Sequence, residues 1–167
     1  MILPPALRKL VLTAHVACSV GWIGAVVAFA GLAIAGLASD DLDVVRGAYL
    51  TMELTGWFVL VPLALTSLVT GLVQSLGTKW GLFRHYWIVF KLAINVAASV
   101  ILIAYMQTLA HLAEVARATS DVGTLRSGSP LLHSLAALVL LLVALTLGVY
   151  KPRGLTPYGR RKQVLRQ

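Results

Sequence analysis

Four long apolar segments dominate this sequence and leave little of the chain for anything else. They run approximately over residues 10–37, 49–76, 86–112 and 131–150. Each segment supplies the ~20 residues that a spanning helix needs, and the leucine, valine and alanine content without strict alternation favours helices over barrel strands. Mean hydropathy is +0.87 and 12% of residues are charged, against roughly 25% in soluble domains. We therefore predict an all-α protein, a bundle of four transmembrane helices.

The length of 167 residues bounds the domain organisation. Four helices, three short connections and a basic tail over residues 151–167 account for the whole chain, so we expect a single integral membrane domain over residues 1–167. The first apolar segment is too long for the core of a signal peptide. We expect it to remain in the protein.

The charged residues divide between the two sides of the membrane. With the N-terminus inside, the inner side carries Arg8, Lys9, Lys79, Arg84, Lys151, Arg153, Arg160, Arg161, Lys162 and Arg166. The acidic residues Asp40, Asp41, Asp43, Glu53, Glu114 and Asp121 then all lie in the outer half. Because short cytoplasmic loops retain lysine and arginine, this pattern predicts that both termini are cytoplasmic. Attraction to anionic lipid headgroups accounts for the net charge of +8, and no nucleic-acid module accompanies it, so we exclude nucleic acid as a partner.

One ionisable side chain, His15, lies inside the first apolar segment. Ser19 and Trp22 follow at helical spacing, so the three side chains share a helix face that should point into the bundle. An imidazole is costly in lipid and usually functional there, and a neutral imidazole is a common ligand of metals and haem iron. We favour a ligand over the alternative, a histidine that only makes hydrogen bonds in the core. Gly21 and Gly24 on this helix would allow a neighbouring helix or a flat cofactor to approach closely.

Further polar residues occur at the depth of His15 in the next two segments. They follow steps of four, as Thr66, Thr70 and Gln74 in the second segment and as Trp87, Lys91, Asn95 and Ser99 in the third. At about 1.5 Å of rise per residue, Lys91 reaches the level of His15. The alternative is that the uncharged members hydrogen-bond between helices and that Lys91 extends to the membrane surface.

A second polar group lies at the opposite ends of the helices. His111 ends the third segment, His133 opens the fourth, and Glu53 and Glu114 lie at a similar depth. Two imidazoles and a carboxylate are donors for zinc or copper, and two histidines are a haem ligand pair. Side chains of this kind also contact headgroups and water at helix ends without any bound ion, so both interpretations remain open.

Two stretches resemble known membrane proteins. HVACSVGWIG, over residues 15–24, and WIVFKL, over residues 87–92, resemble the core of membrane-bound haem-containing protoporphyrinogen oxidases and of copper-resistance D-type membrane domains. The oxidase resemblance implies haem-associated roles for His15 and Lys91. After Trp22 the chain departs from the oxidase pattern, continuing as IGAVVAFAGLAIAG.

A closer resemblance covers nearly the whole chain. TGLVQSLGTKWGLFRHYWIVFKL, over residues 70–92, and YKPRGLTPYGRRK, over residues 150–162, are similar to a family of small bacterial four-helix integral membrane proteins of uncharacterised activity. This resemblance implies a multi-pass protein of the bacterial inner membrane.

These observations predict a membrane protein that binds b-type haem and exchanges electrons with quinone or a porphyrin-like substrate. His15 would ligate the haem iron, Lys91 would be a second ligand or a charge partner for a propionate, and Trp22, Gln74 and Asn95 would line the pocket. The chain contains no nicotinamide or flavin fingerprint, so a catalytic role would be that of a haem-dependent oxidoreductase.

Two other functions remain open. One is a transporter of a small solute or a protein that handles copper or zinc, in which ions pass between an outer half-site at Glu53, His111 and His133 and an inner half-site at His15 and Lys91. Pro62 is its candidate helix break. The other is a cofactor-free assembly subunit whose polar residues only pack helices together. Besides the lipid bilayer, a second copy of the chain is a partner compatible with either.

Overall fold

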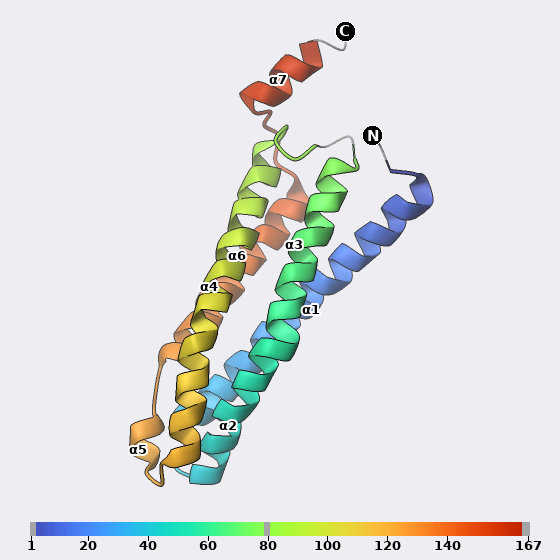
Figure 1. Cartoon of the computed structure of the whole chain (residues 1–167). Helices are drawn as coiled ribbons and strands as arrows, with labels where there is room; N and C mark the ends of the chain where they lie inside the picture. Colours follow the sequence, from blue (N-terminus) through green and yellow to red (C-terminus); the bar gives the residue numbers. More distant parts are fainter. Residues whose placement is uncertain (1–2, 79–80, 165–167) are drawn as a thin grey trace.

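Four long helical spans run alternately up and down the molecule and pack side by side (Figure 1). The computed structural model describes residues 3–78 and 81–164, with side chains up to residue 162. Among these residues, four helical segments are long and apolar enough to cross a membrane, Pro5–Ala38, Leu42–Leu76, Tyr86–Ala118 and Val122–Tyr150. The predicted all-α, four-helix membrane bundle is confirmed.

Seven α-helices and one π-helical turn make up the described part of the chain. They are α1 (Pro5–Ala38), α2 (Leu42–Thr55), the π-helical turn η1 (Gly56–Leu60), α3 (Val61–Leu76), α4 (Tyr86–Ala118), α5 (Val122–Leu125), α6 (Ser129–Tyr150) and α7 (Pro157–Val164). α2, η1 and α3 form one continuous span. Both termini lie at one end of the bundle, which we call the terminal end, and the α1–α2 and α4–α6 connections lie at the other, which we call the acidic end (Figure 1).

Each span is longer than its predicted segment because turns that contain charged residues continue the helix. α2 begins at Leu42, where the Asp41 side chain accepts hydrogen bonds from the backbone amides of Asp43 and Val44. Arg46 in the same helix donates to the backbone carbonyl of Ala116 at 2.8 Å and to that of Thr119 at 2.9 Å. This guanidinium satisfies carbonyls that the end of α4 leaves free, so charge stabilises the extra turns.

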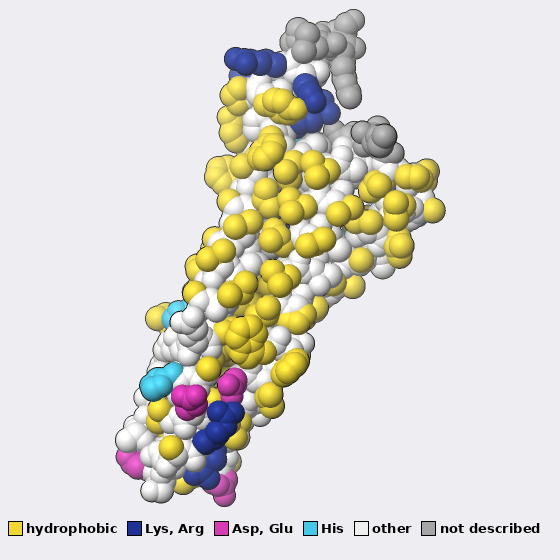
Figure 2. All heavy atoms as spheres, in the orientation of Figure 1, with side chains coloured by type: hydrophobic (Ala, Val, Ile, Leu, Met, Phe, Trp, Pro, Cys, Tyr) yellow, Lys and Arg dark blue, Asp and Glu magenta, His cyan; other side chains and the backbone are white. Residues whose placement is uncertain are grey.

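Large apolar side chains on the outer surface show how the bundle meets lipid. Figure 2 shows hydrophobic side chains along the visible face between a basic terminal end and an acidic end of mixed charge. Phe58, Phe90 and Val139 are between 58% and 76% exposed although they lie within the spans. A soluble bundle would not leave so many such side chains in water. The protein is therefore a multi-pass membrane protein.

The tightest packing lies at the acidic end. Tyr49, Met52, Met106, Leu109 and Leu125 are at most 1% exposed and belong to α2, α4 and α5. α1 packs against the second span and against α6, and α4 packs against the same two neighbours. Toward the terminal end α1 leans away from α4 and α6 (Figure 1). The core is consequently closed at one end and more open at the other.

The second span stays helical through Pro62, which we considered above as a break. Proline lacks an amide proton and its ring collides with the carbonyl four residues earlier. The chain widens at this point into the π-helical turn Gly56–Leu60, in which the Val61 amide bonds to the Gly56 carbonyl. The backbone hydrogen bonds thus change from the α-helical to the π-helical spacing for one turn, and the span continues as a helix.

Three arginines at the acidic end neutralise part of its negative charge. Arg46 pairs with Asp43 at 3.5 Å, Arg117 pairs with Glu53 at 2.7 Å, and Arg126 pairs with Asp40. These arginines were not assigned a side in the sequence analysis. Their pairing leaves the strong excess of positive charge at the terminal end.

The segment after α6 is anchored to the connection between α3 and α4. The Thr156 amide donates to the Arg84 carbonyl at 3.0 Å, its hydroxyl donates to the Phe83 carbonyl at 2.5 Å, and the Tyr86 amide donates to the Gly154 carbonyl at 3.3 Å.

Burial and the neighbouring Arg84 charge lower the pKa of His85 in this connection, which favours the neutral ring. Lys79 and Arg166, which we placed on the inner side, lie outside the described residues.

The buried hydroxyl of Tyr49 provides a test of the packing at the acidic end. It donates to the Leu125 carbonyl at 2.6 Å and accepts from the Ser127 amide at 3.2 Å. Tyr49→Phe leaves both backbone groups unsatisfied and should destabilise the protein by about 1–3 kcal/mol. The measurement is the denaturation midpoint in detergent micelles. Tyr150→Phe, at a side chain that is 79% exposed, is the control and should change nothing; equal midpoints for the two variants would contradict the prediction.

Candidate functional site

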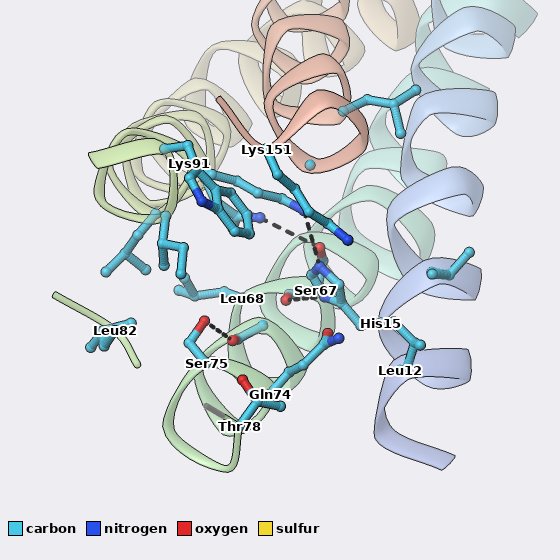
Figure 3. Close-up of a pocket in the computed structure, with 18 of the residues that line it drawn as sticks. Leu12, His15, Ser67, Leu68, Gln74, Ser75, Thr78, Leu82, Lys91 and Lys151 are labelled. Carbon is cyan, nitrogen blue, oxygen red and sulfur yellow. Dashed lines mark hydrogen bonds between the residues drawn. The ribbon is translucent and has the colours of Figure 1, made fainter. Parts of the chain in front are cut away.

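A cavity of about 280 Å³ lies at the terminal end, between all four spans. Figure 3 shows side chains from α1, α3 and α4 and from the end of α6 converging on it. Its polar lining consists of His15, Ser67, Gln74, Ser75, Thr78, Trp87, Lys91, Asn95 and Lys151. The predicted convergence of polar residues from three helices at the depth of His15 is thus present in the structure.

His15 is buried in this cavity, and one of its ring nitrogens is fixed by α3. Its Nδ1 lies 3.1 Å from the Ser67 carbonyl oxygen and 3.2 Å from the Thr70 hydroxyl oxygen. A carbonyl oxygen only accepts hydrogen bonds, so Nδ1 carries the proton and donates a hydrogen bond to the Ser67 carbonyl. This hydrogen-bond pattern assigns a neutral imidazole whose Nε2 lone pair is available on the opposite side of the ring.

Lys91 approaches that second nitrogen from α4. Its Nζ lies 3.5 Å from Nε2 of His15 and donates a hydrogen bond to it (Figure 3). An imidazolium would instead present a proton to an ammonium, so this contact also favours the neutral ring. Two helices on opposite sides of the bundle meet in its interior through these two side chains.

Two glycines leave room for this pair. A Cβ at Gly71 in α3 would lie 3.1 Å from Cε1 of His15, and a Cβ at Gly148 in α6 would lie 3.1 Å from Nζ of Lys91. Both distances are shorter than ordinary van der Waals contact, so the side chains of His15 and Lys91 take the space that a methyl group would need. Gly21 and Gly24, which we had expected to allow the close approach of a neighbouring helix or a flat cofactor, do not bring a neighbouring helix unusually close. A Cβ at Gly21 would make ordinary contact with Leu63, and one at Gly24 would meet open space.

Hydroxyl and amide groups extend the network deeper into the bundle. The hydroxyls of Ser19 and Ser67 lie 2.9 Å apart, and the Asn95 amide donates to the Ser67 hydroxyl at 3.4 Å. The other amide atom of Asn95, Oδ1, is buried without a hydrogen-bond partner in the described part of the chain. Such an atom is costly in a stable core, and here it lies in a residue that lines the cavity.

Two polar residues of the predicted set only bond to their own helices. The Thr66 hydroxyl donates to the Pro62 carbonyl at 2.7 Å, and the Ser99 hydroxyl donates to the Asn95 carbonyl at 2.8 Å. Back-bonding of this kind satisfies a hydroxyl within a membrane helix. Neither residue lines the cavity.

The structure places Trp22 in a different cavity from His15. Trp22 is 2% exposed and lines a second, apolar cavity of about 100 Å³ together with Phe29, Tyr105 and His133. His15, Lys91, Gln74 and Asn95 therefore stay together, whereas Trp22 shares the helix face of His15 but lies too far along α1 to line the same space.

The predicted outer residues have separate partners. Glu53 pairs with Arg117, and His111 is exposed. His133 stacks on Tyr105 with ring centroids 3.9 Å apart, and its Nδ1 donates to the Ser129 carbonyl at 2.9 Å. In residues 3–78 and 81–164 no three His, Cys, Asp or Glu side chains gather in a group that could hold a metal ion.

Sequence reasoning did not find Ser67, Gly71, Gly148 or Lys151. Ser67 acts through its backbone carbonyl, which no side-chain pattern reveals. The glycines carry a weak signal, because small residues in membrane helices mark places where helices or side chains come close. Lys151 had been assigned to the inner rim by charge alone, and the structure brings it into the cavity wall.

Comparisons of the chain with protein-family models, with curated proteins and with solved structures found no match.

The position of Lys91 predicts a stability effect that can be measured without any ligand. A lysine within a span is costly, by roughly 2.5–3.5 kcal/mol at the helix centre and by less near a helix end, where Lys91 lies in the second turn of α4. An interhelical hydrogen bond contributes only about 0.6 kcal/mol. Lys91→Met should therefore stabilise ligand-free protein by about 1 kcal/mol or more, measured by denaturant titration in detergent micelles. Lys9→Met, at an exposed lysine of α1, is the matched control and should have no effect. A lower stability of the Lys91 variant would show that its contacts outweigh the cost of burial.

Proposed function

We propose that this protein binds b-type haem in the cavity at the terminal end and transfers electrons within the bacterial inner membrane. The observation that supports the proposal is the fixed tautomer of His15. Its Nδ1–H is held by the Ser67 carbonyl, so that the Nε2 lone pair is presented inside the bundle. Histidines that ligate metals usually have this arrangement, because a hydrogen bond from the second nitrogen orients the ring.

The donor set fits haem. His15 supplies a neutral imidazole, and Lys91 supplies either a second nitrogen donor, as the amine, or a cation for a propionate. No carboxylate occurs among the lining residues, so the site lacks the anionic oxygen donors with which proteins usually bind magnesium or calcium. The resemblance of the motifs around His15 and Lys91 to haem-containing membrane oxidases supports the same assignment.

The room available is compatible with a ligand that extends beyond the cavity. The volume of about 280 Å³ is close to the lower limit of the roughly 300–1,000 Å³ of ligand pockets. The rim includes Leu12, Val16 and Val149, which are 45%, 50% and 67% exposed. These side chains face the surroundings of the bundle, so the cavity opens along its apolar flank as well as toward the terminal end.

The reaction class follows from what the chain can contribute. Haem, when bound, supplies one-electron chemistry. His15 would hold and orient it, the surrounding apolar spans would exclude water, and the nearby lysines would favour a reduced, more negative state of the ligand. Quinone or a porphyrin-like substrate is the expected partner, because either reaches the apolar flank from lipid.

The transport alternative has less support in the structure. The span through Pro62 is continuous, whereas broken helices are the usual sign of a transporter site. In addition, Glu53 is paired with Arg117.

The first test is the absorption spectrum of protein purified after expression with ample haem supply. We expect wild-type protein to show a Soret band. The band should be absent from the His15→Ala variant and present in the His133→Ala variant, which is the matched control because His133 lines the second cavity. Size-exclusion profiles and helical circular dichroism identify any variant that has not folded. Colourless wild-type protein would remove the proposal, and loss of the band only in the His133 variant would move the site to the other end.

A gentler change tests the position of the His15 ring. Gly71→Ala adds a methyl group 3.1 Å from Cε1 of His15 and must displace the imidazole by a few tenths of an ångström. Because ligand geometry tolerates only ~0.5 Å, haem affinity should fall by about tenfold, as measured by haem titration. Gly24→Ala adds the same group in open space and should bind haem as the wild type does; equal losses for the two variants would count against His15 as the ligand.

A further inference from the structure

All carboxylate side chains of this chain lie far from the cavity at the terminal end. The six acidic residues occur between residues 40 and 121, in α2, at the acidic-end connections and in the acidic-end parts of the second and third spans. Residues 1–39 and 122–167 contain none. No side chain of the chain can therefore neutralise Lys91 at the level of His15 by forming an ion pair.

Lys91 is not the only cation in the cavity wall. Lys151 lines the same cavity from the end of α6, where the chain turns through a left-handed conformation with φ of 45°. In Figure 3 the side chains of Lys91 and Lys151 both extend toward the His15 side of the cavity. Two like charges that line one cavity repel one another, and a negative group between them would reduce this repulsion.

The remaining lining suits a negative group better than a positive one. His15 and the Gln74 amide provide hydrogen-bonding atoms, and no acidic side chain lies among the lining residues to pair with Lys91. The apolar rim of Leu12, Val16 and Val149 suits a hydrophobic body attached to that group. The site thus combines two cations in its wall with an apolar rim on its flank.

We propose that the cavity binds the oxyanion group, carboxylate or phosphate, of a hydrophobic ligand between Lys91 and Lys151. Ammonium groups form charge-assisted hydrogen bonds with such oxyanions, and these bonds are stronger in surroundings of low dielectric constant. Two sources share this chemistry. One is a propionate of haem, in which case the inference rests on the proposed function; the other is the phosphate of an anionic lipid, in which case it does not.

The first arm of the experiment separates the propionate from the rest of the haem. Wild-type protein is titrated with haem and with haem dimethyl ester, which lacks both negative charges. If propionate is the ligand, haem binds at least about tenfold more tightly than the ester, the size expected of one charge-assisted hydrogen bond. The preference disappears in Lys151→Gln and returns in Lys151→Arg. Arg153→Gln, at an exposed neighbour, keeps it.

The second arm uses haem-free protein and native mass spectrometry with phosphatidylglycerol and phosphatidylcholine. If a lipid phosphate is the ligand, phosphatidylglycerol is retained at least about tenfold more than phosphatidylcholine, and Lys151→Gln removes the difference while Arg153→Gln does not. A preference lost equally in both variants would indicate general surface charge and overturn the inference.

The two arms also separate this inference from the proposed function. Equal binding of haem and its ester, together with equal retention of the two lipids, overturns the oxyanion site and leaves the haem function standing. Protein that binds neither form of haem but retains phosphatidylglycerol through Lys151 overturns the haem function and supports the oxyanion site.

Discussion

The hydrogen bond from His15 to the Ser67 carbonyl determines what the interior of this bundle can do. A backbone carbonyl cannot exchange donor and acceptor roles, and so it fixes which nitrogen carries the proton. The ring held in this orientation directs its Nε2 lone pair toward Lys91, and its edge takes the space that a side chain at residue 71 would need. A side-chain partner would have allowed the ring to flip, and the site would then have lacked a defined chemistry.

The tightly packed core and the polar cavity lie at opposite ends of the bundle. Its best-packed side chains, among them Tyr49 and Met106, lie near the acidic end, where arginine pairs and backbone bonds also hold the helix ends. The terminal end contains the cavity, a lysine within a span and the unpartnered Oδ1 of Asn95. Features that reduce stability gather where the helices diverge, as expected when a tightly packed region supports a site that is itself poorly packed.

Much of the fold was accessible from the sequence because apolar length alone determines spanning helices. Depth along the helices also predicted that Lys91, Gln74 and Asn95 would meet His15, since rise per residue is nearly constant. Helix ends were placed too far inward because charged turns were assigned to loops, whereas Arg46 stabilises them through carbonyls that are distant in sequence. Trp22 was expected to line the pocket of His15 but lines a different one, because a shared helix face does not imply a shared cavity. The role of Ser67 could not be predicted, because its backbone carbonyl accepts the hydrogen bond from His15 and any residue type has such a carbonyl.

The attachment of the C-terminal segment constrains how the protein is assembled in the cell. The Gly154 carbonyl bonds to the first amide of α4, and Thr156 bonds to the residues just before it, so a segment that is translated after α6 holds the start of the helix that bears Trp87 and Lys91. Lys151, in the same late segment, completes the cavity wall. During synthesis the first three spans can enter the bilayer and associate, but the wall of this chamber is incomplete until α6 and the segment after it have left the ribosome. A small molecule that contacts the whole wall is therefore loaded only after all four spans have been made.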